Sequence, residues 1–212
     1  MLFPSYEGGE DKVLQIANSI IPFTTTKYAA KLGADLYFAI RKANKKEALE
    51  IIRNVEEGSN TIEKCLAIVA IDGNKDKREE LYRIYDEHIL LKNRIYDLKT
   101  KLESANMIRE MIIKHNRRVL WQIQRIYRTR NLIIHSGKSL PFINALVENV
   151  HSYLDRVLDI LMEETSRSDG QTSIDQICAQ LKLQHDSHLN LLRKAKREYC
   201  AKDNYKKLLF GN

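Results

Sequence analysis

Proline, glycine and cysteine are all scarce in this chain, and long apolar runs are missing. Three prolines and eight glycines among 212 residues leave few places where a helix must stop, while 30% of the residues are charged. This composition is typical of a helix-rich globular protein. No window approaches the roughly 18 consecutive apolar residues that a membrane span needs. The sequence therefore predicts no membrane partner.

The few cysteines indicate the compartment. Cys65, Cys178 and Cys200 are odd in number and lack Cys-x-x-Cys spacing, which argues against a disulfide framework. The first residues also lack the basic and apolar segments of a secretory signal peptide. We therefore expect a cytoplasmic protein. No group of histidine, cysteine and carboxylate residues has good metal-ligand spacing, so the sequence predicts no metal and no cofactor.

Acidic residues are absent from one long stretch, between positions 111 and 147. The net charge of the whole chain is +7. The acid-free stretch alone carries seven basic residues, namely Lys114, Arg117, Arg118, Arg125, Arg128, Arg130 and Lys138. Clustered positive charge attracts the phosphate backbone of nucleic acids. A second basic run, between positions 193 and 207, is as well explained by a solvated helix face.

The spacing of apolar residues predicts helices along nearly the whole chain. We expect them over residues 10–21, 27–43, 45–57, 62–71, 76–102, 105–135 and 141–165, with a last helix from 174. The predicted fold class is therefore all-α. Four long helices after residue 75, joined by short links, favour an up-and-down bundle. Residues 1–59 are expected to be an N-terminal helical extension packed on that core, 60–166 the core bundle, and 173–212 the C-terminal helix and basic tail.

One predicted helix end carries a motif. Arg130 and Asn131 are followed by His135, close to the end of the helix expected over 105–135, and Gly137 is the stop signal. The run Arg-Asn-x-x-x-His resembles the signature of the HEPN superfamily, and the likeness covers about residues 60–165. Members of one subgroup carry a tyrosine two residues after the histidine, where an antitoxin modifies it. Glycine stands there in this chain, so that form of regulation is not expected.

The resemblance implies both a fold and an activity. It implies a HEPN-like four-helix core and a metal-independent endoribonuclease, in a toxin–antitoxin or antiphage defence setting. RNA would be the substrate, and an antitoxin or regulatory protein a further partner. It also implies a homodimer that gathers two arginines and two histidines into one site.

The chemistry of the motif fits that implication, because RNA carries its own nucleophile, the ribose 2′-OH. His135 is the expected general acid and base, since imidazole exchanges protons near neutral pH. Arg130 is expected to bind the scissile phosphate through paired donors, and Asn131 to orient the histidine or the phosphate. Flanking phosphates are expected to bind three further residues, Arg125, Arg128 and Lys138.

Two alternatives remain open. One is a non-catalytic HEPN-like domain that binds RNA or nucleotides, and the other is a structural bundle in which the motif residues are ordinary surface or cap residues. A second Arg-x-x-x-x-His match ends at His88. It lies within the helix expected over 76–102, so His88 is predicted to face the bundle interior. Trp121 is expected to pack against the core, with base stacking as the alternative.

Overall fold

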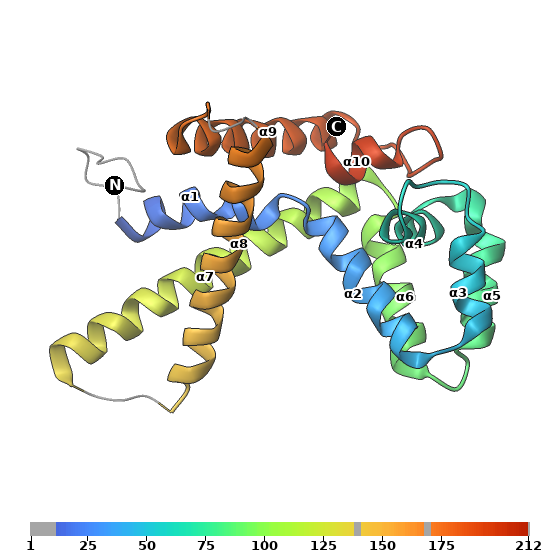
Figure 1. Cartoon of the computed structure of the whole chain (residues 1–212), viewed down its shortest axis with the longest axis horizontal. Helices are drawn as coiled ribbons and strands as arrows, with labels where there is room; N and C mark the ends of the chain where they lie inside the picture. Colours follow the sequence, from blue (N-terminus) through green and yellow to red (C-terminus); the bar gives the residue numbers. More distant parts are fainter. Residues whose placement is uncertain (1–11, 138–140, 168–170, 212) are drawn as a thin grey trace. The chain divides into compact units, whose positions relative to one another are not determined.

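The computed structural model describes residues 12–137, 141–167 and 171–211, and these residues form an all-α fold. Within these ranges the extended pairing is confined to an isolated antiparallel bridge between Ser104 and Tyr199. No helix in the described part combines the length and the apolar content needed to cross a membrane. The elements are α1 (Lys12–Thr25), α2 (Tyr28–Ala43), α3 (Lys46–Arg53), α4 (Thr61–Ala70), η1 (Asp72–Asn74), α5 (Lys75–Ile84), α6 (Ile89–Leu102), α7 (Ala105–Ser136), α8 (Ile143–Arg167), α9 (Ile174–Lys194) and α10 (Tyr205–Phe210) (Figure 1).

Contacts divide the chain into two compact units. Unit 1 comprises Met1–Thr26 and Ile113–Asp186, and unit 2 comprises Lys27–Ile112 and Ser187–Asn212. Two of the boundaries fall inside the helices α7 and α9, so each of these helices contributes to both units. The limits differ from the division at residues 59 and 166 that the sequence suggested.

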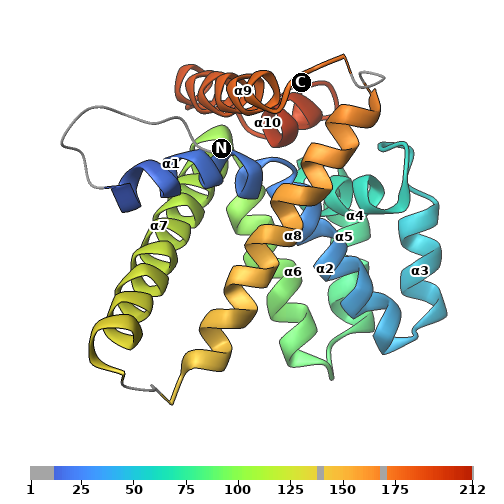
Figure 2. The same cartoon turned by 60° about the vertical axis from the view of Figure 1, so that its left-hand side comes forward.

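Helix α4 lies at the centre of unit 2 (Figure 2). A helix that is apolar on every side must be covered on every side, and α2, α3, α5 and α6 all contact α4. Gly33 of α2 allows the closest approach, because a Cβ atom at that position would lie 2.6 Å from Cγ of Leu66. The buried residues of α4 are Cys65, Leu66, Ala67, Ile68, Val69 and Ala70.

The N-terminus of α4 is closed by side chains. The Oδ1 atom of Asn60 accepts a hydrogen bond from the backbone N–H of Glu63 at 2.9 Å. The Glu63 carboxylate accepts from the backbone N–H of Ser59 at 2.8 Å and from the ammonium of Lys206 at 2.8 Å. The Lys206 hydrogen bond, with that of Ser59, holds the pKa of Glu63 below its usual value. This reciprocal arrangement satisfies free N–H groups that every helix start exposes.

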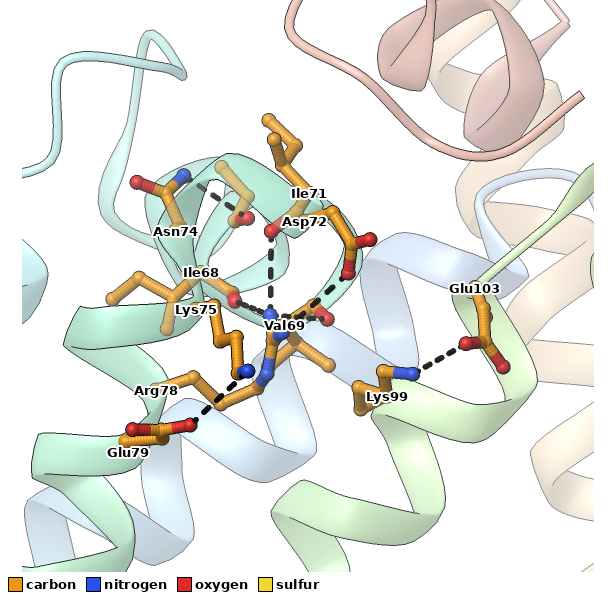
Figure 3. A network of polar contacts seen from close by, with 11 residues as sticks. Ile68, Val69, Ile71, Asp72, Asn74, Lys75, Arg78, Glu79, Lys99 and Glu103 are labelled. Carbon is orange, nitrogen blue, oxygen red and sulfur yellow. Dashed lines mark hydrogen bonds and ion pairs between the residues drawn. The ribbon is translucent and has the colours of Figure 1, made fainter.

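The C-terminus of α4 is closed by the buried side chain of Arg78, which is 4% exposed. Its Nη1 atom donates to the carbonyl oxygens of Ile68 at 2.8 Å, Val69 at 3.3 Å and Ile71 at 3.3 Å (Figure 3). The carboxylate of Asp72 lies 3.8 Å from Nη2 and is largely exposed. One cation therefore satisfies the carbonyl groups of Ile68 and Val69 and adds a second donor to that of Ile71, which also accepts from the backbone N–H of Asn74 at 3.1 Å.

The single helix expected over 76–102 is wrong, because α5 ends at Ile84 and α6 begins at Ile89. Tyr85 is fully buried, and a turn follows in which the backbone N–H of His88 donates to the Tyr85 carbonyl at 3.0 Å. An ion pair between Asp86 and Lys92, 2.5 Å apart, spans the turn. His88 is exposed rather than turned to the interior, which corrects that expectation as well.

Unit 1 packs α1 against α7 and α8. Its first apolar cluster contains Val13, Ala17, Ile21, Val119 and Ile123, and its second contains Phe23, Ile160, Ile177 and Leu181. The first helix was expected to end at residue 21, but α1 continues through Pro22 to Thr25. The guanidinium of Arg156 donates to the carbonyl oxygen of Thr26 at 2.6 Å and so satisfies that backbone group just after the end of α1.

Candidate functional site

One side of α7 carries exposed cations from the middle of the helix to its C-terminus. Its members recur at steps of three and four residues, so they lie on one side of the helix. We call this surface the basic face. It consists of Lys114, Arg117, Arg118, Trp121, Arg125, Arg128, Leu132 and His135, all of them exposed. The opposite side of α7 is buried through Val119 and Ile123. Trp121 is 62% exposed, so the expectation that it packs against the core is wrong.

The motif residues occupy the last turns of α7. Arg130 and His135 are exposed, while Asn131 is half-buried. The Nη1 atom of Arg130 donates to Oδ1 of Asn131 at 3.0 Å. Gly137 ends the helix with a φ of 64°, and its N–H donates to the carbonyl of Ile133 at 2.9 Å. The predicted stop signal at Gly137 is therefore confirmed.

Arg130 continues the side of α7 that is buried further upstream, yet it is exposed. The last turns of α7 and the first turns of α8 spread apart in both views (Figures 1 and 2). Ile134, in the same last turns of α7, is 58% exposed as well. The apolar cluster that covers Val119 and Ile123 therefore does not extend to this end of the helix.

Two of the predicted residues come together in a hollow. Arg128 and Asn131 line it with Gln124, Tyr127 and Val13, and its volume is about 290 Å³. We call it the α1–α7 hollow. The sequence analysis missed Gln124 and Tyr127, although their three- and four-residue steps to Arg128 and Asn131 place all four on one side of α7. Nothing in the sequence pointed to Val13, which reaches the hollow from α1.

Other predicted residues are not brought together. A five-residue step places Arg130 and His135 about 140° apart around the helix axis. Within the described ranges, no hydrogen bond or ion pair joins His135 to Arg130 or Asn131. The guanidinium of Arg125 instead stacks 4.5 Å from the ring centre of Phe142. Lys138, the remaining predicted phosphate ligand, lies outside the described residues.

The second basic run is partly neutralised within unit 2. The Lys202 ammonium lies 3.2 Å from a carboxylate oxygen of Glu56, and the Lys206 ammonium lies 2.8 Å from one of Glu63. These two lysines therefore tie the C-terminal segment to the residues that precede and open α4. The cations left exposed in the first part of the run are Arg193, Lys194, Lys196 and Arg197.

Two further histidines have internal partners. The ring nitrogens of His185 lie 3.0 Å from the Asn116 side-chain nitrogen and 3.1 Å from an Asp186 carboxylate oxygen. The Nε2–H group of His188 donates to the carbonyl oxygen of Leu208 at 2.9 Å. Both rings therefore have a structural role. In the described ranges, no three histidine, cysteine or acidic side chains are grouped so that they could hold a metal ion.

Helix α8 presents an apolar side to solvent. Its members are between 42% and 60% exposed and recur at three- and four-residue steps. We call it the α8 stripe, and it consists of Val147, Val150, Leu154, Leu158 and Met162. Exposed acids border it, namely Glu148, Asp155 and Asp159. A continuous apolar side of this length is typical of a contact surface.

The fold and these surfaces define an all-helical protein that displays cations, an aromatic ring and an imidazole along one side of a helix. No protein-family model, curated protein or solved structure matches the chain. A function is therefore argued from the residues of this site alone.

Proposed function

We propose that the protein is a metal-independent endoribonuclease with a HEPN-like four-helix core, which cleaves RNA by attack of the ribose 2′-OH. The observation that carries the proposal is the acid-free basic face of α7, which ends in the exposed imidazole of His135. An RNA strand whose phosphates bind along that face lies next to the imidazole of His135, which exchanges protons near neutral pH. Trp121 offers an unpaired base a ring on which to stack.

The proposed reaction requires a proton acceptor, a proton donor and stabilisation of charge. An imidazole removes the 2′-OH proton, the 2′ oxygen bonds to phosphorus, and the bond from phosphorus to the 5′ oxygen breaks. An imidazolium returns a proton to the departing 5′ oxygen. The guanidinium of Arg130 binds the negative oxygens of the phosphorane, and Asn131 positions that guanidinium through the hydrogen bond already formed between them. The products are a 2′,3′-cyclic phosphate and a 5′-OH.

The proposed site is composite, because one helix cannot turn Arg130 and His135 toward the same point. A twofold homodimer that apposes two α7 ends would bring an arginine of one protomer to a histidine of the other. The α8 stripe supports this arrangement, since burying what its five side chains still expose stabilises an interface by about 4–7 kcal/mol per protomer. The acids beside the stripe also complement the cations of α7.

The test is cleavage of a mixed panel of single-stranded RNAs in EDTA. We expect 2′,3′-cyclic phosphate ends, and we expect His135→Ala and Arg130→Ala each to lower the rate by about 10²- to 10⁴-fold. His151→Ala is the matched control, because His151 is an exposed histidine of α8 outside the motif. If His135→Ala cleaves as fast as the wild type, the assignment is wrong.

A non-catalytic RNA-binding domain is the second candidate. The bond that holds Arg130 on Asn131, without any described contact to His135, favours it. This candidate gives strongly salt-dependent RNA binding without products. Leu154→Glu distinguishes the nuclease from the non-catalytic binding domain. A charge in the α8 stripe should prevent dimerisation, and light scattering should then give the mass of a monomer. Cleavage by those monomers at the wild-type rate would exclude the composite site.

A further inference from the structure

We infer that the α1–α7 hollow is a subsite for one unpaired adenine of the RNA strand, read by the side chain of Gln124. The inference rests on the proposed function for its ligand, an RNA strand lying along α7. The volume, about 290 Å³, lies at the lower end of the range for small-molecule sites. It suits a single base rather than a longer segment.

The lining of the hollow has the polarity that a base requires. Gln124 and Asn131 are both half-buried, so their amides face a partly dehydrated space in which hydrogen bonds discriminate. Tyr127 is 40% exposed and offers a ring for stacking, and Val13 supplies an apolar contact from α1. Among the residues that the structure describes, none with an acidic side chain lines the hollow, so none of them repels the phosphate attached to a bound base.

The donors and acceptors still available point to adenine. A primary amide presents one donor and one acceptor side by side, which matches N7 and the N6 amino group of adenine. Within the described ranges the Gln124 amide has no hydrogen-bond partner, so both of its groups are available. The Oδ1 atom of Asn131 is occupied by Arg130, which leaves the amide hydrogens of Asn131 to donate to a ring nitrogen.

Arg128 has a different part in this subsite. Arginine reads guanine when its guanidinium reaches the base edge. Arg128, however, is exposed and belongs to the basic face with Arg125 and Lys114. It therefore binds the phosphate of the nucleotide whose base enters the hollow, while Gln124 contacts the base.

The experiment measures binding of the full chain to labelled uridine oligomers that carry one central adenosine, guanosine, cytidine or uridine. Fluorescence anisotropy should show the adenosine oligomer bound about 5- to 150-fold more tightly than the all-uridine oligomer. Gln124→Ala should abolish that preference, and Gln124→Glu should weaken binding of every oligomer. Gln180→Ala, at an exposed glutamine of α9, should leave the preference unchanged.

The outcomes separate this inference from the proposed function. His135→Ala should slow cleavage as described above and retain the adenosine preference. If Gln124→Ala retains the preference while His135→Ala slows cleavage, the subsite is wrong and the nuclease assignment stands. A preference for guanosine would overturn the reading of the base by Gln124. Absence of RNA binding by the wild-type protein would overturn both.

Discussion

Replacement of Arg78 should destabilise the protein more than replacement of any exposed cation. The guanidinium is 4% exposed and donates to three backbone carbonyls, one at 2.8 Å and two at 3.3 Å. A hydrogen bond to a charged group contributes about 1.5–3 kcal/mol, and a buried carbonyl left without a donor costs about 1–3 kcal/mol. Since two of the three contacts are long, we expect Arg78→Ala to lower the free energy of unfolding by about 3–5 kcal/mol.

The ion pair with Asp72 provides the matched comparison. Its carboxylate is 80% exposed and lies 3.8 Å from the guanidinium, so solvent screens the attraction. Asp72→Asn should therefore change the free energy of unfolding by less than about 0.5 kcal/mol. Arg78→Lys keeps the charge, but its shorter side chain does not bring an N–H donor as far as Nη1 of Arg78 reaches. The loss in free energy of unfolding should therefore fall between those of Arg78→Ala and Asp72→Asn.

Urea unfolding followed by circular dichroism measures the overall change, and the thiol of Cys65 reports on α4 itself. Cys65 is 1% exposed, so a brief pulse of thiol reagent labels it when α4 opens. In Arg78→Ala this labelling should begin at a lower urea concentration. If Arg78→Ala and Asp72→Asn unfold at the same urea concentration, the carbonyl-capping argument is wrong.

Three further predictions concern the surface and the buried groups. Trp121→Ala should weaken binding of single-stranded RNA by about 5- to 150-fold, because stacking of one base contributes about 1–3 kcal/mol; anisotropy measures this, and unchanged affinity would contradict it. The pKa of Glu63 is lowered in the folded protein, so its contribution to stability is complete above its unfolded value of 4.5 and is lost as the pH falls below that value. Urea titrations should accordingly show the stability difference between the wild type and Glu63→Gln as constant from pH 6 to 8 and shrinking below about pH 4.5; a difference that does not shrink at all below that pH would refute the linkage. Burial raises the pKa of Cys65 and of Cys200 to about 12, so at pH 8 the native protein should react with Ellman's reagent at Cys178 first, as peptide mapping can establish.

The all-α class was predictable because the apolar spacing is strong. The helix expected over 62–71 is confirmed by α4, although an apolar run of this length could also form a buried strand. The break between α5 and α6 was not predictable from spacing, because the apolar pattern passes through Tyr85 and His88 without a change of period. The turn at that point depends on the burial of Tyr85 and on its local hydrogen bonds, and neither has a sequence signal.

The candidate site was predictable only along α7. The acid-free stretch and its helical spacing suffice to place Arg125, Arg128 and His135 on one side of the helix. Trp121 lies on that same side, because it precedes Arg125 by four residues, about one helical turn. The expectation that it packs against the core overlooked this spacing. Val13 could not be assigned to the hollow at all, because no pattern in a sequence tells where α1 packs on a helix about a hundred positions later.

The chain passes between its two units three times, at residues 26, 112 and 186. Unit 1 is consequently an interrupted stretch of sequence, with α1 encoded far upstream of α7 and α8. Recombination moves uninterrupted pieces of a gene. A piece that encodes both Val13 and the His135 end of α7 must therefore also encode residues 27–112, which belong to unit 2. The two units are thus inherited as one module.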